Sequence, residues 1–454
     1  MSIPRYTLPE MKDLWSEQRK YQGWLDVELA LLRARVKLGQ LEPGVYESIA
    51  QHASFSVERV EAIDTEINHD LISLVQTVQE SLTAAGYGEY SREVHKGITS
   101  FDTEDPALML RLGESARIIL AALDRLYVEL LNLAHKHKTT MMIARTHGQY
   151  AEPDSFGRLC LVFADQQHNN LMRLRSCIDE ELIWAKFSGA IGNYAGLDPE
   201  LERLVLEELG LMPVDVSTQI VQRDHHASYL NVLAVIASTI EQLARTLWEM
   251  SRSDVGEVRE PFGKKQKGSS AMAHKKNPIM LERMIGMAKM VRAKSQTLME
   301  VISTPECRDI SQSCVEREVY PDATSYTHYM IVKMTNIVRG LEVSQGKMKE
   351  NLERTLGVWA SQQIRIALID AGVSYEEAYR FMQERCFAAT QDGKHLNQCL
   401  DASSIQLNGQ HIDIINLLGG WAVRVERFFD AWEYTKDGIE AIFERFPTST
   451  PSGG

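Results

Sequence analysis

Long stretches without proline most constrain how this chain can fold. One extends from Ala107 to Lys138 and another from Phe156 to Phe187, and in both the apolar residues recur at helical spacing. A helix of about 30 residues is roughly 45 Å long, which suits a long bundle better than a small lobe. Further long helices are predicted at 229–250, from Met280 to about Ile302, and from Asp322 to about Asn351. Because strand patterns are nearly absent, the sequence predicts an all-α fold.

The stretch 229–250 also predicts assembly. Its apolar side chains line one face of a helix, and much of the remaining surface of that helix is apolar too. The residues of the main face are Leu233, Ile236, Ile240, Leu243, Leu247 and Met250. We therefore expect other copies of the same chain to complete the bundle.

Shorter elements flank the predicted bundle. Pro9, Pro43 and Gly86–Gly88 interrupt the helices near the start, and short helices return after about residue 352. The sequence thus predicts an N-terminal helical domain (1–101), a central bundle of long helices (102–351) and a C-terminal helical domain (352–454). The last residues, "PTSTPSGG", predict a disordered tail.

Charge and cysteine content narrow the class of protein. A formal net charge of −13 argues against a general nucleic-acid binder, because spare cations are needed to replace the counterions of phosphate. The uncharged stretch between Asp224 and Glu241 is too short and too mixed to span a bilayer, and the start shows no signal peptide. The six cysteines show no zinc-like spacing. We expect a cytoplasmic protein with no membrane or nucleic-acid partner. Two histidine pairs lack companion ligands at fitting spacing, so we expect no metal site there: His135 with His137, and His225 with His226.

Four polar segments at the ends of predicted helices hold more chemistry than packing requires. They are "HKGITSFD" (95–102), "RTHGQYAEPDSFG" (145–157), "KKQKGSSAMAHKKNP" (264–278) and "ECRDISQSCVERE" (306–318). Each has a structural explanation as well. Thr99 and Ser100 could cap the following helix, His147 could be an ordinary loop histidine, and Arg308 and Arg317 could form surface ion pairs.

Together the segments favour a site for an anionic substrate. Lys275, Asn277 and loop amides suit carboxylates, and His147 can move a proton near neutral pH. Arginine offers a planar bidentate donor for phosphate, which favours a phosphate-binding set of Arg308, Ser313 and Arg317. These groups indicate lyase or transferase chemistry on a polyanion.

The same segments resemble a known superfamily. "GSSAMAHKKNP" (268–278) is similar to the GSSxMPxKxNP signature of the fumarase/aspartase superfamily, and "HKGITSFD" and "ARTHGQYAEP" resemble its two other active-site regions, in the same order. "RYTLPEM", "STQIVQRDHH" (217–226) and "RDISQSCVER" (308–317) resemble the adenylosuccinate lyase family within it. The resemblance covers nearly the whole chain.

This resemblance implies a fold, an assembly and a reaction. It implies three helical lobes with a long central bundle, in a homotetramer whose active sites are shared between subunits. The implied reaction is β-elimination of fumarate from adenylosuccinate, giving AMP, and from succinyl-aminoimidazole carboxamide ribotide in purine biosynthesis. No cofactor is implied.

The resemblance also assigns roles to residues. Ser269 is the general base, His147 in the Thr146–His147 pair is the general acid, and Glu282 orients that histidine. Lys275 and Asn277, with Thr99 and Ser100, would bind the succinyl carboxylates. The nucleotide end falls to Arg5, Tyr6, Arg308, Ser313 and Arg317. Further substrate-binding positions are Asn68, His69, Asp70, His95, Thr146, Gln219, Ser270 and Arg283.

Three positions depart from the family pattern. Ala273 replaces the signature proline, which gives the loop backbone freedom, and Lys276 replaces an arginine. Asn68 replaces the arginine of an Arg-His-Asp triplet, which removes a cation expected near the nucleotide. A relative that cleaves another N-succinyl compound, a carboxymuconate cycloisomerase-like enzyme and a non-catalytic relative similar to the lens crystallins are the alternatives. The retained Ser269, His147 and Lys275 argue against the last.

Overall fold

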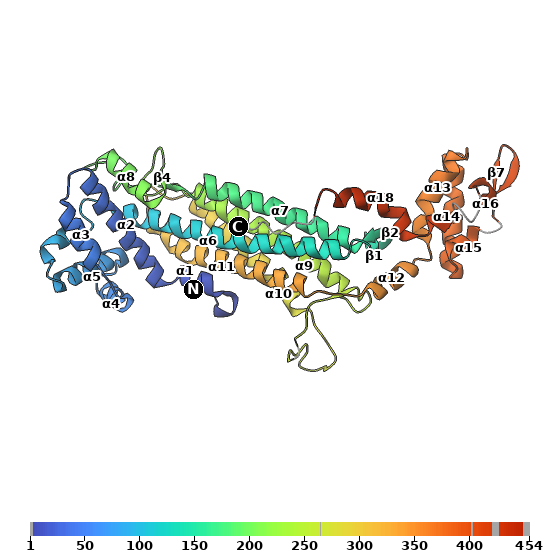
Figure 1. Cartoon of the computed structure of the whole chain (residues 1–454), viewed down its shortest axis with the longest axis horizontal. Helices are drawn as coiled ribbons and strands as arrows, with labels where there is room; N and C mark the ends of the chain where they lie inside the picture. Colours follow the sequence, from blue (N-terminus) through green and yellow to red (C-terminus); the bar gives the residue numbers. More distant parts are fainter. Residues whose placement is uncertain (1–2, 264, 401–402, 420–425, 448–454) are drawn as a thin grey trace. The chain divides into compact units, whose positions relative to one another are not determined.

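The computed structural model describes residues 3–263, 265–400, 403–419 and 426–447 (Figure 1). The described chain is mostly helical, which confirms the predicted fold class. Lys264 of the lysine-rich segment and all of the predicted tail except Pro447 lie outside the described residues.

Helices of three lengths follow one another. The early ones are η1 (Pro4–Tyr6), α1 (Pro9–Leu14), α2 (Glu17–Lys37), α3 (Pro43–His52), α4 (Val57–Ile67), α5 (Asp70–Ala84) and η2 (Gly88–Glu93). Then come α6 (Ser100–Lys136), α7 (Phe156–Glu180), α8 (Pro199–Leu209), α9 (Asp224–Met250), α10 (Ile279–Val301), α11 (Ile310–Arg339) and α12 (Gln345–Glu353). The last are η3 (Val358–Ala360), α13 (Ser361–Asp370), α14 (Tyr375–Asp392), α15 (Leu396–Leu400), α16 (Ile414–Leu417), α17 (Glu426–Phe428) and α18 (Ala431–Phe443).

The strands of the described chain form two-stranded pairs. The antiparallel pairs are β1 (Met141–Thr146) with β2 (Gln149–Ser155), β5 (Val258–Arg259) with β6 (Glu342–Val343), and β7 (Ser404–Leu407) with β8 (Gln410–Asp413). The parallel pair is β3 (Trp184–Ala185) with β4 (Met212–Pro213).

The chain divides into two compact units. The first comprises residues 1–124, 168–242 and 283–333, and the second comprises 125–167, 243–282 and 334–454. Five long helices, α6, α7, α9, α10 and α11, contribute residues to both. The three-part division of the sequence stays a prediction.

In the first unit, α2 to α5 and α8 lie together around an apolar core (Figure 1). Trp24, Leu31, Leu74 and Val205 belong to this core. The parts of the long helices in this unit are joined by polar pairs between α6 and α9, α7 and α9, and α10 and α11. These pairs are Ser115–Tyr229 (2.8 Å), Asn170–Thr239 (2.8 Å) and Lys294–Asp322 (2.9 Å).

In the second unit, a separate core joins α13, α14, α15 and α16. Trp359, Ile364 and Phe381 belong to it, and Ile143 of β1 packs into the same cluster. The β1–β2 hairpin is therefore anchored to the C-terminal helices by its buried strand.

Helix α9 is long and apolar enough to cross a membrane by length and composition alone, but half of that apolar window is buried inside the protein. Its predicted core face is buried, with exposures from 0% at Leu233, Ile236 and Ile240 to 7% at Met250. These residues make α9 a core helix of the bundle.

Two helices begin earlier than the sequence predicts. Helix α6 starts at Ser100 and contains Pro106, and α11 starts at Ile310 and contains Pro321. A proline inside a helix removes one hydrogen bond and crowds the carbonyl four residues back. In a long bundle, burial of the remaining turns outweighs that cost. Most of segment 306–318, predicted as a connection, is therefore helical, whereas α7 ends at Glu180, before the predicted Phe187.

Candidate active site

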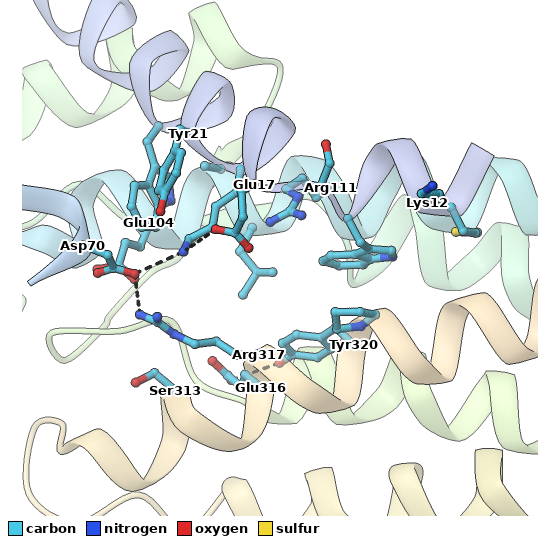
Figure 2. A pocket seen from close by; sticks show the side chains of 18 of the residues that line it. Lys12, Glu17, Tyr21, Asp70, Glu104, Arg111, Ser313, Glu316, Arg317 and Tyr320 are labelled. Carbon is cyan, nitrogen blue, oxygen red and sulfur yellow. Dashed lines mark hydrogen bonds and ion pairs between the residues drawn. The ribbon is translucent and has the colours of Figure 1, made fainter. Parts of the chain in front are cut away.

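A cavity of about 630 Å³ in the first unit is lined by two of the predicted phosphate-binding residues (Figure 2). Ser313 and Arg317 are four residues apart on α11, so both face the same side. Arg317 Nη2 lies 2.8 Å from Asp70 Oδ2, and Lys20 Nζ lies 3.2 Å from the same oxygen. Asp70, the first residue of α5, thus bridges two cations.

The carboxyl groups of this cavity differ in charge. Burial alone would raise the pKa of Asp70, but Lys20 and Arg317 outweigh it and hold the pKa below its ordinary value. Burial, reinforced by the charge of Asp70, raises the pKa of Glu104 to about 8. Near neutral pH only Asp70 of this pair is ionised, so an anion approaching Arg317 meets one negative charge from the pair.

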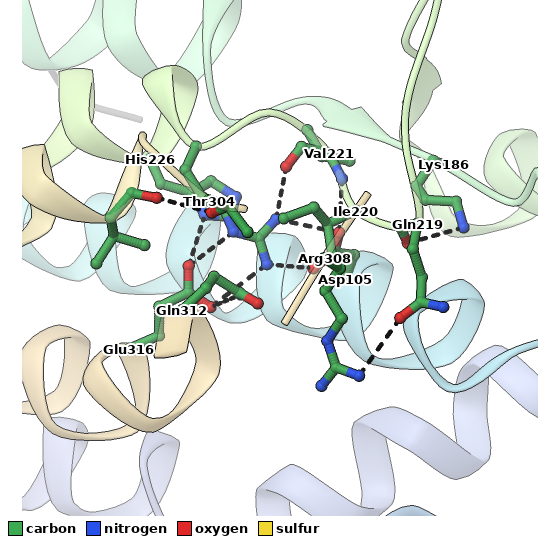
Figure 3. Close-up of polar contacts among 12 residues, drawn as sticks. Asp105, Lys186, Gln219, Ile220, Val221, His226, Thr304, Arg308, Gln312 and Glu316 are labelled. Atoms are coloured by element: carbon green, nitrogen blue, oxygen red, sulfur yellow. Dashed lines mark hydrogen bonds and ion pairs between the residues drawn. The ribbon is translucent and has the colours of Figure 1, made fainter. Parts of the chain in front are cut away.

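Arg308 and Gln219 form a second group in the same unit (Figure 3). Arg308 Nη1 donates to Gln219 Oε1 at 3.3 Å, and its guanidinium lies 4.2 Å from the centre of the Phe101 ring. Gln219 Nε2 donates to the Ala190 carbonyl at 2.9 Å. Arg308 Nε is buried and has no hydrogen-bond partner among the described residues, so this donor remains for a ligand.

A buried ion pair connects this group to the start of α6. Lys186 Nζ and Asp102 Oδ1 are 2.6 Å apart, and both side chains are fully buried. Lys186 also donates to the Gln219 carbonyl at 3.0 Å, while Asp102 Oδ2 accepts from the Thr99 N–H at 3.0 Å. Thr99 is therefore capped by Asp102, as in half of a capping box, and Ser100 opens the helix.

Arg223 is the centre of a buried network beside these groups (Figure 3). It donates to Glu316 on α11 at 2.7 Å and to Asp105 on α6 at 2.8 Å. Asp105 also accepts from the Val221 N–H at 2.8 Å. The network thus fixes the segment that contains Gln219 and the turn of α11 that contains Arg317.

The network has fixed charges near neutral pH. Burial would raise the pKa of Glu316, but Arg223 and its other partners hold the pKa at about 2. Burial and the charge of Arg223 lower the pKa of His226, whose Nδ1 lies 2.8 Å from the Tyr320 hydroxyl. His226 is therefore neutral. The remaining paired histidines also contact protein groups: His225 with Glu181, His135 with the Phe446 carbonyl, and His137 with Thr140.

Other predicted positions in this unit form smaller groups. Tyr6 packs edge-on against Tyr329 with ring centroids 5.6 Å apart, and Arg283 lies 5.6 Å from the Tyr6 ring. Arg5 is exposed beside Tyr6 in η1. His95 Nδ1 lies 2.7 Å from Glu28 Oε1 on α2.

Asn68 and His69 lie exposed between α4 and α5. Asn68 ends α4 with a φ of 54°, in the left-handed region that Asn adopts more readily than Arg. His69 precedes α5 and its Nδ1 accepts from the Ile72 N–H at 3.5 Å. The departure at Asn68 therefore has a structural explanation.

In the second unit, Ser269 lies in a loop held by its own backbone. Its hydroxyl oxygen accepts from the N–H groups of Ala271 (3.3 Å) and Met272 (3.1 Å). A Cβ on Gly268 would lie 2.1 Å from the Lys275 carbonyl oxygen, so only glycine allows this close approach. The loop thus brings the Ser269 segment against the backbone of Lys275. Ser270 and Lys275 are exposed, and Asn277 is half-buried before α10.

His147 lies at the tip of the β1–β2 hairpin, where the sequence predicts no strands. Thr146 pairs with Gln149, which leaves a two-residue turn, His147–Gly148, with φ of 53° and 75°. Positive φ at both positions is the pattern of a type I′ turn. Thr146 and His147 are both exposed. Arg145, at the base of the tip, lies 3.4 Å from the buried Glu257.

The three predicted proton-transfer residues lie on different segments of the second unit. Glu282 is exposed in the first turn of α10 and accepts from Trp248 Nε1 at 3.4 Å. Among the contacts of the described residues, none joins His147 to Ser269 or to Glu282. A single chain therefore does not bring the predicted acid and base together.

Sequence reasoning missed the buried charges that support the site. Arg223 and Glu316 lie inside the stretches "STQIVQRDHH" and "RDISQSCVER", but their pairing depends on contacts between distant segments. Lys186 and Asp102 were missed for the same reason. The one available indication was the charge itself, at positions between apolar neighbours.

Comparison with known proteins places the whole chain among lyases. Residues 5–293 match a family model described as lyase. The chain is 41% identical to adenylosuccinate lyase of Thermotoga maritima over 98% of this chain and 99% of that protein. It is 40% identical to adenylosuccinate lyase of Bacillus subtilis over 85% and 88%, respectively.

Solved structures agree with this fold. A fumarate lyase from Mesorhizobium sp. BNC1 superposes with a TM-score of 0.85 at 22% identity, over 97% of both chains. The 3-carboxy-cis,cis-muconate lactonizing enzyme from Pseudomonas putida superposes with a TM-score of 0.80 at 25% identity, over 97% of this chain and 98% of that one.

Proposed function

The chain belongs to the adenylosuccinate lyase family of the fumarase/aspartase superfamily, and on that premise we propose that it eliminates fumarate from adenylosuccinate, leaving AMP. The same reaction on succinyl-aminoimidazole carboxamide ribotide would serve purine nucleotide biosynthesis. The observation that supports this most is the identity to adenylosuccinate lyases over nearly the full length of both chains.

In this proposal Ser269 removes the proton next to a succinyl carboxylate. The electron pair of the broken C–H bond forms a carbanion delocalised into that carboxylate. The pair then forms the C=C bond of fumarate as the C–N bond breaks. A serine is a weak base unless its alkoxide is stabilised. The two backbone N–H groups that already donate to Ser269 Oγ support the role, because they can stabilise that charge.

His147 is the proposed general acid, which protonates the leaving nitrogen and so balances the proton that Ser269 takes. Its exposed position at a hairpin tip supports contact with a substrate. Lys275 and Asn277, with Thr99 and Ser100, are proposed to bind the carboxylates. Arg308 and Arg317 are proposed to bind the phosphate, and the unpartnered Nε of Arg308 supports this.

We place the enzyme in the cytoplasm as a homotetramer with shared active sites. Exposed apolar side chains on α7, α9 and α10 support further association of these helices; they include Val162, Met172, Val235, Met290 and Met299. The separation of His147 from Ser269 within one chain is what a shared site predicts. The structural role of Asn68 removes the main reason to prefer a different N-succinyl substrate.

The first test is incubation of the purified protein with adenylosuccinate, with AMP and fumarate measured together. Release of both in equal amounts supports the proposal. If the folded protein releases neither, the substrate assignment is wrong and other N-succinyl or dicarboxylate compounds become the candidates.

A mixing experiment tests the shared site. Ser269→Ala and His147→Asn variants are each expected to be nearly inactive alone. After dissociation and joint reassembly, mixed oligomers contain some sites with both native residues, so part of the activity should return. Absence of any recovery in mixed oligomers would contradict a site built from different subunits.

A further inference from the structure

A buried carboxylate on α2 holds His95 by both its side chain and its backbone. Glu28 is 2% exposed. Its Oε1 lies 2.7 Å from His95 Nδ1 and accepts from the Thr103 hydroxyl at 2.9 Å. Its Oε2 accepts from the His95 N–H at 3.0 Å. Both oxygens of one carboxylate are thus engaged around a single residue.

His95 has a backbone that needs such support. Its φ is 58°, in the left-handed region that is unfavourable for residues other than glycine. Arg35, seven residues after Glu28 and on the same face of α2, donates to the carbonyl of the next residue, Lys96. Helix α2 therefore fixes the turn at 95–96 from two positions.

The contacts with Glu28 also determine which ring nitrogen can meet a ligand. With the carboxylate accepting, the hydrogen between the two groups belongs to Nδ1. Nε2 is then the remaining ring nitrogen, and His95 retains 12% exposure of its side chain. A carboxylate that fixes a histidine tautomer in this way acts through the ring and needs no contact with the substrate.

We propose that Glu28 is a positioning residue for the elimination reaction: it fixes the backbone and the ring of His95 so that Nε2 faces the substrate. The proposal rests on the proposed function for its reaction. Glu28 does not transfer a proton to the substrate; its contribution passes through His95. A buried carboxylate is costly to desolvate, and here its three acceptor contacts offset that cost.

A double-mutant cycle in kcat/KM for adenylosuccinate tests this. Glu28→Gln leaves one acceptor oxygen and adds a donor, so one of the two His95 N–H groups faces a donor. We expect kcat/KM to fall about 10- to 100-fold, mostly through KM, as for other partners that orient a ligating histidine. His95→Asn removes the ring but suits a left-handed backbone. In that background Glu28→Gln should change kcat/KM by less than about threefold.

Asp26→Asn is the matched control, because Asp26 is an exposed acid on α2 that bonds Gln22 rather than His95. It should leave kcat/KM unchanged. Equal losses from Glu28→Gln with and without the His95 ring would show a purely structural role and overturn the proposal.

A second measurement does not depend on turnover. In 15N-histidine spectra, with the His95 resonance assigned from the His95→Asn variant, the neutral ring should carry its hydrogen on Nδ1. Glu28→Met, which offers no acceptor oxygen, should shift the ring toward the Nε2–H form. A wild-type ring already in the Nε2–H form overturns the proposal. If adenylosuccinate is not turned over at all, the proposed function fails while this measurement still decides the role of Glu28.

Discussion

The predicted nucleotide-binding residues and the predicted proton-transfer residues are held in place by different interactions. In the first unit, side chains hold side chains: Arg317 pairs with Asp70, and Arg223 pairs with Glu316 inside the protein. In the second unit, Ser269 is held by neighbouring backbone N–H groups, and His147 stands exposed on a two-residue turn. One region is therefore preorganised within the chain, whereas the other leaves its reactive groups accessible.

A second hairpin shows that His147 is not there for the turn. Asn408–Gly409, between β7 and β8, has φ of 51° and 78°, nearly the values of His147–Gly148. Asn-Gly is the preferred sequence for this turn, whereas histidine at positive φ is strained. The same backbone thus carries a favourable residue in one hairpin and a less favourable one in the other. Retention of histidine at the strained position points to its side chain.

The largest expected effect comes from making the first hairpin resemble the second. His147→Asn should lower kcat for fumarate release about 10²- to 10⁴-fold, because a general acid is lost. The free energy of unfolding should stay the same or rise slightly, since Asn suits the turn. Ser269→Ala should lower kcat by a similar factor through loss of the base. Steady-state kinetics and denaturant unfolding of the same preparations measure both quantities.

Asn408→His is the matched control for that pair. It introduces the strained residue into the second hairpin, so we expect unchanged turnover and a loss of about 1 kcal/mol or less in unfolding free energy. Near-normal turnover in His147→Asn would refute its role as the acid. A large loss of folding in the same variant would place its importance in structure.

The next largest effect should be on stability, in the region that side chains hold. Glu316→Gln removes one partner of the buried Arg223, and such losses cost about 3–5 kcal/mol. Glu318→Gln, two residues along the same helix and 59% exposed, should cost less than about 1 kcal/mol. Denaturant unfolding at one protein concentration compares the two. Similar values for both variants would mean that the network contributes little.

The same network predicts how stability depends on acid. The pKa of Glu316 is about 2 in the folded protein, below the value of about 4.3 in an unfolded chain. Because the folded pKa is depressed, its stabilisation is complete above pH 4.3 and is lost as the pH falls toward 2. Between those limits the stability of Glu316→Gln should depend less on pH than that of the native protein.

A smaller effect is expected on substrate affinity. Arg317→Met keeps the bulk of the stem but removes the guanidinium, and charged hydrogen bonds contribute about 1.5–3 kcal/mol. We expect KM for adenylosuccinate to rise about 10- to 100-fold with a smaller change in kcat. Arg339→Met, at the far end of the same helix and paired with Glu129, is the control. A fall in kcat with unchanged KM would move Arg317 from binding to chemistry.

The helices could be predicted because their periodicity is local to each stretch. The core face of α9 was correct residue by residue. Helix α11 was misplaced because proline at 321 locally disfavours a helix that packing across the bundle nevertheless favours. The hairpin at 141–155 was missed because its strands show little alternation of polar and apolar residues.

The candidate site divides in the same way. Ser313 and Arg317 could be grouped from their spacing on one helix face. Glu28, Lys20 and Arg223 could not, because each meets its partner from a distant part of the chain. Buried charges of this kind are determined by tertiary packing, which the pattern of one segment does not contain.

The smallest effect concerns the loop that holds Ser269. Ala273 stands where the signature has proline, and it lies four residues after a serine whose hydroxyl is held only by the loop backbone. Proline restricts the unfolded or open loop, and such substitutions contribute about 0.4–1 kcal/mol where the backbone allows them. Ala273→Pro should therefore raise kcat about two- to fivefold if closure of the loop limits turnover. Lys276→Arg, which restores the other family residue in the same loop without restricting the backbone, is the control. Unchanged turnover in Ala273→Pro, with unchanged protease resistance of the loop, would show that the missing proline does not limit closure, and that the accessible region of the site is as ordered as its reaction requires.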